Sequence, residues 1–160
     1  MSEEMVTVNM TVNGETVMKT IPVRTHLVDF IRTELGFTGS HLGCEHGICG
    51  ACTVLMDGDS VRSCLTLAVQ ADGASVETVE SLGDIEALGP LQEAFREHHA
   101  LQCGFCTPGM LMTATDMLRK YDLATDDDIR DGLSGNICRC TGYQNIVAAV
   151  RSAADKRDAT

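Results

Sequence analysis

The N-terminal half of the chain alternates apolar and polar positions as half-buried strands do. Apolar residues between Val6 and Val12 are separated by single polar residues, and Asn13-Gly14 follows them. An Asn-Gly pair favours the positive φ angles of a two-residue hairpin turn. The pattern predicts a β-hairpin at the start of the fold.

The spacing of apolar residues then changes from that of a strand to that of a helix. Between Thr25 and Leu35 they recur at helical spacing, and Gly36 is placed to end the helix. A loop rich in glycine and cysteine is expected over residues 36–52. Two hairpin strands follow at residues 53–56 and 60–63, and a last strand at residues 74–79. The first half is therefore predicted to be a compact α+β unit.

The second half has the periodicity of helices. Gly83, Gly89 and Pro90 indicate a linker before it. Four helices are expected: one near residues 91–95, one with Thr107 as N-cap and Pro108 in the first helical position that continues to Leu118, one from Asp126 to Leu133, and one from Tyr143 to about Ala154. The acidic run at residues 126–128 is interpreted as a helix cap rather than a cation site, because a helix N-terminus favours negative charge. The change near Ser81 predicts two domains, residues 1–80 and residues 81–160.

Composition narrows the class of protein. Of 160 residues, 44% are hydrophobic and 22% charged, as in globular proteins, and the net charge is -11. That charge is the wrong sign for neutralising phosphates, so no nucleic-acid partner is expected. No apolar run reaches the length of a membrane span. The start of the chain lacks the features of a secretion signal, and a cytoplasmic location is expected.

Eight cysteines form two sets of four, one in each half of the chain. The first set is Cys44, Cys49, Cys52 and Cys64, with the spacing C-x4-C-x2-C and a more distant fourth member. This opening matches the plant-type 2Fe-2S ferredoxin pattern. Nearby glycines let the backbone bend tightly and aim N–H groups at sulfur. We expect these four cysteines to hold an iron-sulfur cluster.

The second set is Cys103, Cys106, Cys138 and Cys140, a C-x2-C pair and a C-x-C pair separated by 31 residues. Each pair lies at the edge of a predicted helix, so two helix ends must converge to close a second metal site. Tetrahedral zinc is the main alternative for these thiols, and more so for the second set than for the first. Structural disulfides are disfavoured in a reducing compartment. Catalytic motifs for nucleotides, phosphates or zinc hydrolases do not occur, and no catalytic residue is predicted.

Three motifs carry a resemblance to a known family. They are GCEHGICGACTV at residues 43–54, QCGFCTPG at residues 102–109 and GNICRCTGY at residues 135–143. In this order they resemble the small iron-sulfur subunit of the xanthine oxidase family of molybdenum hydroxylases, over residues from about 5 to 154. The tripeptide at residues 45–47 departs from the one typical of carbon monoxide dehydrogenases and points to a heterocycle or purine hydroxylase.

The resemblance implies an architecture and a role. It implies a β-grasp, ferredoxin-like 2Fe-2S domain followed by an all-α four-helix-bundle 2Fe-2S domain. The chain would carry electrons from a molybdopterin centre in a large subunit, through two 2Fe-2S clusters, to FAD in a medium subunit. The cluster on Cys103, Cys106, Cys138 and Cys140 would face molybdenum, and the one on Cys44, Cys49, Cys52 and Cys64 would face flavin. Gln102 and Cys140 match positions that contact the pterin.

The resemblance also implies an assembly, a dimer of heterotrimers in which this chain does no substrate chemistry of its own. Two other function classes remain open from the residues alone. One is a free-standing two-cluster ferredoxin that shuttles electrons between separate enzymes. The other is a zinc-stabilised binding module, which would be colourless and free of sulfide.

Overall fold

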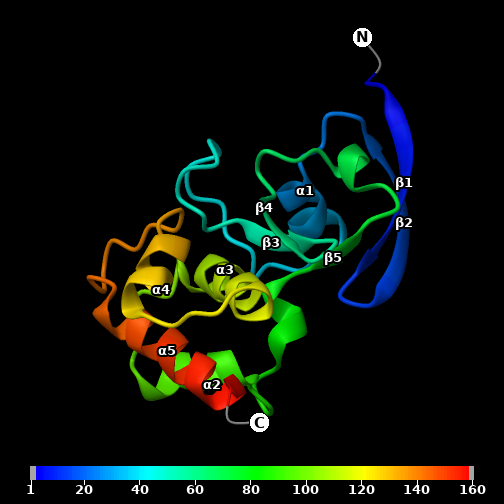
Figure 1. The fold of residues 1–160 in the computed structure, drawn as a ribbon. Helices are drawn as coiled ribbons and strands as arrows, with labels where there is room; N and C mark the ends of the chain where they lie inside the picture. Colours follow the sequence, from blue (N-terminus) through cyan, green and yellow to red (C-terminus); the bar gives the residue numbers. More distant parts are fainter. Residues whose placement is uncertain (1–2, 159–160) are drawn as a thin grey trace.

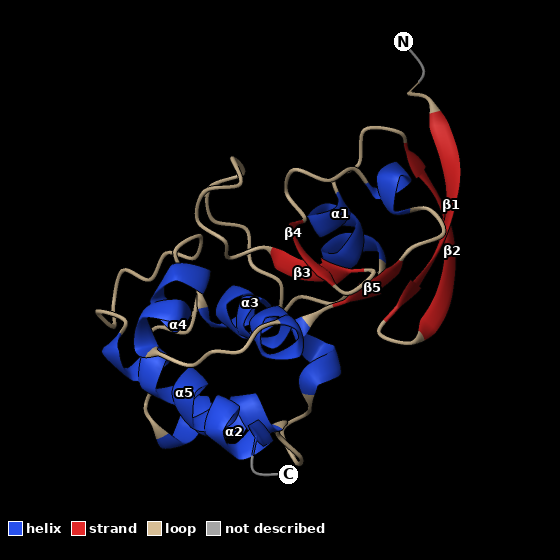
Figure 2. Ribbon diagram, in the orientation of Figure 1, coloured by secondary structure: helices blue, strands red, loops and turns tan. Residues whose placement is uncertain are grey.

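The computed structural model describes residues 3–158, which adopt a mixed α+β fold (Figures 1 and 2). The strands are β1 (Met5–Val12), β2 (Glu15–Pro22), β3 (Thr53–Met56), β4 (Asp59–Arg62) and β5 (Ser75–Glu77). The α-helices are α1 (Leu27–Asp29), α2 (Pro90–Glu97), α3 (Thr107–Lys120), α4 (Asp126–Gly132) and α5 (Gln144–Asp158). Two 3-10 helices cover Ala68–Ala71 and Val79–Leu82.

The strands form one sheet in the order β2-β1-β5-β3-β4, with β1 and β5 parallel and the other neighbours antiparallel. The predicted first hairpin is confirmed: Asn13 (φ 51°) and Gly14 (φ 86°) make its turn, and Asp57 and Gly58 repeat the geometry between β3 and β4. One face of the sheet is buried against the helix at Leu27–Glu34, whose Phe30 and other apolar residues complete a core. This packing explains the alternation in β1, since only every second side chain can face that core.

The predicted helix before Gly36 is confirmed, but it is not α-helical throughout. After α1 it continues as a π-helix at Phe30–Glu34, and the N–H of Leu35 donates to the carbonyl of Phe30. Gly36 follows with a φ of 79°, as its terminating role requires.

Helices α2 to α5 surround a second core that includes Phe95, Met110, Ile129 and Ile146. The acidic run at residues 126–128 does lie in the first turn of α4, where the Asp128 carboxylate accepts from the N–H of Thr125; Thr125 itself is the N-cap residue, which the sequence pattern did not identify. Several helix boundaries differ from prediction by a few residues. Helix α3 already includes Thr107, so Cys106 is its N-cap, and α5 continues to Asp158.

Helix α3 lies where the two halves meet, beside β3 and β4 (Figure 1). Asp116 accepts from the N–H of Ser60 at 3.2 Å, and Arg119 makes two 2.8 Å hydrogen bonds with Glu77 of β5. Lys120 pairs with Asp116 and with Asp59. These contacts fix α3 against the sheet edge and so place the loop before α3 beside the loop before β3. No helix among the described residues is long and apolar enough to cross a membrane.

Candidate metal centres

The first cysteine set lies on the long loop before β3 and just after β4. The β3–β4 hairpin folds Cys64 back beside Cys52, and the Ser63 hydroxyl donates to the Cys52 carbonyl at 2.6 Å. Cys52 and Cys64 are buried, whereas Cys44 and Cys49 are half-buried. The sheet therefore holds one pair of thiols rigidly, and the loop wraps the other pair around them.

Thiols of the first set meet in two pairs. The thiol of Cys44 is close enough to that of Cys49 to affect its pKa, and the thiol of Cys64 is in the same relation to that of Cys52. The backbone N–H groups of Cys49 and His46 both donate to Cys44 Sγ at 3.4 Å and lower the pKa of Cys44 to about 6. Burial, helped by the adjacent Cys52 thiol, raises the pKa of Cys64 to about 11. A nearby metal would supply the positive charge that such a buried thiolate needs.

The second set is assembled from two helix ends. Cys103 and Cys106 precede α3, and Cys138 and Cys140 precede α5, so the second set forms where the loops before these two helices meet. The sulfur atoms of Cys103 and Cys140 lie 3.5 Å apart, and the thiol of Cys138 is close enough to that of Cys106 to raise its pKa. The second set is thus also two facing pairs, although 31 residues separate its C-x2-C motif from its C-x-C motif in the sequence.

Thr141 provides the clearest hydrogen bond to sulfur in the second set. Its hydroxyl donates to Cys138 Sγ at 3.1 Å and its N–H donates to the same atom at 3.4 Å. Burial acts to raise the pKa of Cys138, but these donors outweigh it and the net shift is downward. At Cys106 the donors do not offset burial, and burial raises the pKa of this thiol to about 12. The two donors at Thr141 therefore favour the anionic form of Cys138.

The donor set fits a binuclear iron-sulfur cluster in each half. All eight cysteines are free thiols, and in each set they face one another two by two. Each iron of a 2Fe-2S cluster takes two cysteine thiolates, so a pair on either side of the cluster is the arrangement it requires. Among the residues that the structure describes, no three His, Cys, Asp or Glu side chains converge on a single ion position. Thr107, directly after Cys106, has a buried hydroxyl that makes no hydrogen bond. A buried hydroxyl normally has a partner, so this one is available to donate to a group bound at the second set.

The two centres are joined by their backbones. The N–H of Ile137, one residue before Cys138, donates to the carbonyl of Cys49 at 2.9 Å. Gly109 of α3 lies against Gly50, so closely that an added Cβ on Gly109 would be 2.1 Å from the Gly50 carbonyl oxygen. The loop of the first set and both segments of the second are thereby in direct main-chain contact.

The remaining predicted residues lie at the surface of these centres. Gln102, Cys103 and Cys140 are exposed on the second set. His41 stacks on Phe105 with ring centroids 4.7 Å apart, in the space between the two loops. Sequence reasoning assigned His41 no role, and its stacking partner is 64 residues away.

Polar residues around the second set were also missed. Tyr143 accepts from the N–H of Cys138 at 2.9 Å and donates to the carbonyl of Asn136 at 3.3 Å. The side chains of Asn136 and Arg62 make hydrogen bonds between the N-terminal and C-terminal halves of the chain, to the carbonyls of Gly50 and Gly135 respectively. The motif around residues 135–143 was the available signal, but nothing in it tells a buried polar residue from a solvated one.

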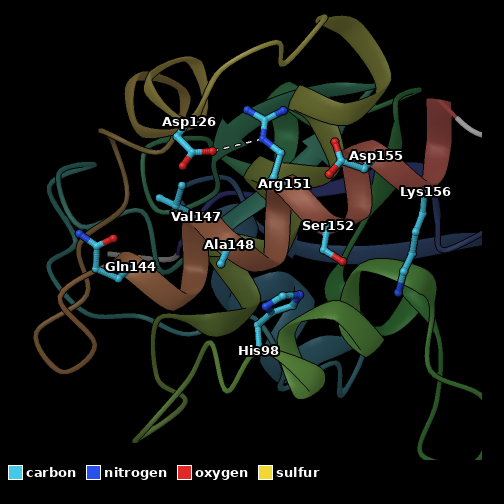
Figure 3. Close-up of a pocket in the computed structure, with 9 residues that line it drawn as sticks. All are labelled: His98, Asp126, Gln144, Val147, Ala148, Arg151, Ser152, Asp155 and Lys156. Atoms are coloured by element: carbon cyan, nitrogen blue, oxygen red, sulfur yellow. Dashed lines mark hydrogen bonds and ion pairs between the residues drawn. The ribbon is translucent and has the colours of Figure 1, made fainter.

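A separate hollow lies between α5 and the end of α2 (Figure 3). Its volume is about 580 Å³, and its lining includes His98, Ser152 and Lys156 but none of the cysteines. Arg151 in its wall is paired with Asp126 at 3.2 Å, as the dashed line in Figure 3 marks. This hollow belongs to neither metal centre.

Comparison with known proteins agrees with this division into two centres. A family described as "2Fe-2S iron-sulfur cluster binding domain" matches residues 2–93, and one described as "2Fe-2S binding domain" matches residues 78–151. The chain is 55% identical over 148 residues to caffeine dehydrogenase subunit gamma of Pseudomonas sp. (strain CBB1), covering 91% of this chain and 89% of that one. It is 56% identical over 148 residues to the nicotine 6-hydroxylase small subunit of Paenarthrobacter nicotinovorans, covering 92% and 89%. The chain belongs to the small iron-sulfur subunits of the xanthine oxidase family of molybdenum hydroxylases.

Solved structures agree with this family assignment. Quinoline 2-oxidoreductase from Pseudomonas putida 86 contains a chain with a TM-score of 0.92 and 48% identity, and the match covers 97% of both chains. Members of this family are iron-sulfur subunits of oxidoreductase complexes. The chain is accordingly an electron-transfer subunit with two 2Fe-2S sites, not a free-standing ferredoxin.

Proposed function

We propose that the two cysteine quartets are the ligands of the two clusters and form the electron route of a molybdenum hydroxylase complex. Cys44, Cys49, Cys52 and Cys64 hold one cluster, and Cys103, Cys106, Cys138 and Cys140 hold the other. A bound 2Fe-2S cluster supplies one-electron redox chemistry. The observation that carries the proposal is the 2.9 Å hydrogen bond between Ile137 and Cys49, because it joins a ligand of one quartet to the residue before a ligand of the other.

Residues around the two quartets stabilise the negative charge of cysteine thiolates. The N–H groups that point at Cys44 and the two donors of Thr141 at Cys138 stabilise thiolate sulfur. Burial of Cys52 and Cys64 excludes water from one side of the first centre. Gly50, with a φ of 74°, makes the tight bend that lets Cys49 and Cys52 face the same space.

We propose that the second quartet faces the molybdenum subunit and the first faces the flavin subunit. Exposed apolar side chains at both centres support docking of partners there. Ile48 and Leu65 beside the first set are 63% and 60% exposed, and Phe105 and Ile137 beside the second are each 49% exposed. Large apolar side chains left in solvent at a functional centre are typical of surfaces that a partner covers.

Gln102 and Cys140 are proposed to contact the pterin of the large subunit. Both are exposed at the second set, so an incoming cofactor can reach them.

The proposed partners are a large molybdopterin-binding subunit and a medium FAD-binding subunit in a dimer of heterotrimers. The complex is proposed to work in the cytoplasm, where free thiols such as these eight stay reduced until the clusters are inserted.

The fold is proposed to consist of a β-grasp domain at residues 1–80 and a four-helix bundle at residues 81–160. The two separate apolar cores, one on the sheet and one among α2 to α5, support this division.

For the complex as a whole we propose a nitrogen heterocycle as substrate, since similar chains belong to caffeine and nicotine enzymes.

Metal analysis with spectroscopy of the purified chain tests the cluster assignment. We expect about four irons and four sulfides per chain, and two distinct paramagnetic signals after reduction. A colourless protein that contains zinc and no sulfide would contradict it.

A further inference from the structure

The segment at residues 135–137 is held against the loop of the first quartet by side chains as well as by the Ile137 hydrogen bond. Arg62, at the end of β4, donates to the carbonyl of Gly135 at 2.8 Å and to the Thr53 hydroxyl at 2.7 Å. Both quartets therefore border one small polar junction between the halves of the molecule.

Asn136 lies at the centre of this junction and is only 2% exposed. Its side-chain amide donates to the carbonyl of Gly50 at 3.1 Å and accepts from the Thr113 hydroxyl at 2.9 Å. A carbonyl can only accept, so the contact with Gly50 fixes which end of the amide is the donor. The residue thus links the first loop, through Gly50, to α3, through Thr113.

The space around this amide is filled. A Cβ added to Gly50 would come within 2.6 Å of Asn136 Nδ2 and of the Gly135 carbonyl oxygen. Tyr143 binds the carbonyl of Asn136 from the other side, at 3.3 Å. With backbone and side chain both engaged, Asn136 has one available orientation.

The side-chain contact of Asn136 and the hydrogen bond between Ile137 and Cys49 join consecutive residues of the same two segments. Asn136 holds Gly50, the residue after Cys49, and Ile137 follows Asn136 directly. If the amide contact opens, the hydrogen bond between Ile137 and Cys49 loses its nearest support. Buried polar groups of this kind specify one arrangement when all their partners are present.

We propose that Asn136 is a positioning residue that keeps the two cysteine loops in contact and so sets the coupling between the two clusters. The proposal rests on the proposed function, because it requires both quartets to be loaded. Asn136 touches no thiol itself, and its effect passes through Gly50 and Ile137.

The test compares two buried hydrogen bonds of the same residue in the intact, cluster-loaded complex. Asn136→Leu and Asn136→Asp both remove the donor to Gly50, and Asn136→Asp keeps an acceptor for Thr113. Thr113→Val is the matched control, since it removes a buried hydrogen bond but leaves the Gly50 contact in place. The readouts are the magnetic interaction between the two reduced clusters and hydrogen exchange of peptides that contain Ile137.

In both Asn136 variants we expect full iron content, a weaker magnetic interaction and roughly tenfold faster exchange at Ile137. Thr113→Val should keep the magnetic interaction of the wild type. Unchanged coupling in both Asn136 variants, equal changes in Thr113→Val, or loss of iron from the Asn136 variants would overturn the proposal. Two clusters in the wild type that show no magnetic interaction would also overturn it, whereas a wild-type protein that lacks one or both clusters would instead overturn the proposed function.

Discussion

The N–H of Ile137 donates to the carbonyl oxygen of Cys49 across 2.9 Å, and the main chain alone makes this contact. Cys49 belongs to the first quartet, and Ile137 precedes Cys138 of the second. Under the proposed function, this hydrogen bond between peptide groups would give electrons a short route that no side-chain substitution removes directly. Changes that move the backbone are therefore the ones expected to matter.

Gly109→Ala is expected to lower the free energy of unfolding by about 1–3 kcal/mol, because its Cβ would be 2.1 Å from the Gly50 carbonyl oxygen. Gly132→Ala is the matched control in another helix. Its Cβ would meet the end of the flexible Met117 side chain, which can move aside. Denaturant unfolding followed by circular dichroism measures both, and an equal loss in the two variants would show that the backbone contact has no special weight.

Thr141→Val removes the hydroxyl that donates to Cys138 Sγ at 3.1 Å. Donors to cluster sulfur stabilise the reduced, more negative state, so the reduction potential of one cluster should fall by roughly 20–60 mV, the equivalent of one ordinary hydrogen bond. Thr141→Ser keeps the hydroxyl and should keep the potential. A redox titration monitored by paramagnetic resonance separates the two clusters. If Val and Ser shift the potential equally, the hydroxyl is not the cause.

Cys106→Ser should abolish one of the two paramagnetic signals, lower the iron content by about two per chain, and stop turnover from substrate to acceptor. Cys49→Ser should abolish the other signal. The pair is informative because the two cysteines lie in different quartets. Normal turnover in a correctly assembled Cys106→Ser complex would contradict the assigned route.

The contact between α3 and the sheet should weaken in acid. The hydrogen bonds from Arg119 lower the pKa of Glu77, and although burial acts to raise the pKa of Asp116, its bonds to Lys120 and Ser60 lower it overall. A carboxylate whose pKa is lower in the folded state contributes stability above its ordinary pKa and loses it as the pH falls through the folded value.

Glu77→Gln and Asp116→Asn should therefore destabilise the protein at pH 7, and by less at the lowest pH at which it remains folded. The measurement is the free energy of unfolding of each variant and of the wild type at both pH values. A destabilisation of the same size at both would show that the effect is one of packing rather than charge.

Much of the fold follows from local rules that the sequence displays. The turn at Asn13-Gly14 and the acidic first turn of α4 at residues 126–128 each depend on neighbouring residues only, so both were predictable. The π-helical turn at Phe30–Glu34 was not, because its amide pairing is decided by packing on the sheet. Thr107 as N-cap was wrong by one residue, since helix ends vary by one or two positions.

The candidate sites divide in the same way. Cysteine spacing and order predicted both quartets as sets, because clustered cysteines with such spacing are typical of metal ligands. The positioning residues could not be predicted, since Asn136 and its acceptor Gly50 are 86 residues apart and Asn is common in solvated loops. Only the packing of α3 on the sheet brings them together.

Isolation of the complex from its own host tests the central claim most directly. Co-purifying proteins are identified by mass spectrometry, and iron, sulfide, molybdenum and flavin are assayed in the same sample. We predict stoichiometric large and medium subunits with molybdenum, FAD and about four irons for each copy of this chain. A lone chain with four irons and neither molybdenum nor flavin would contradict the assignment to a molybdenum hydroxylase.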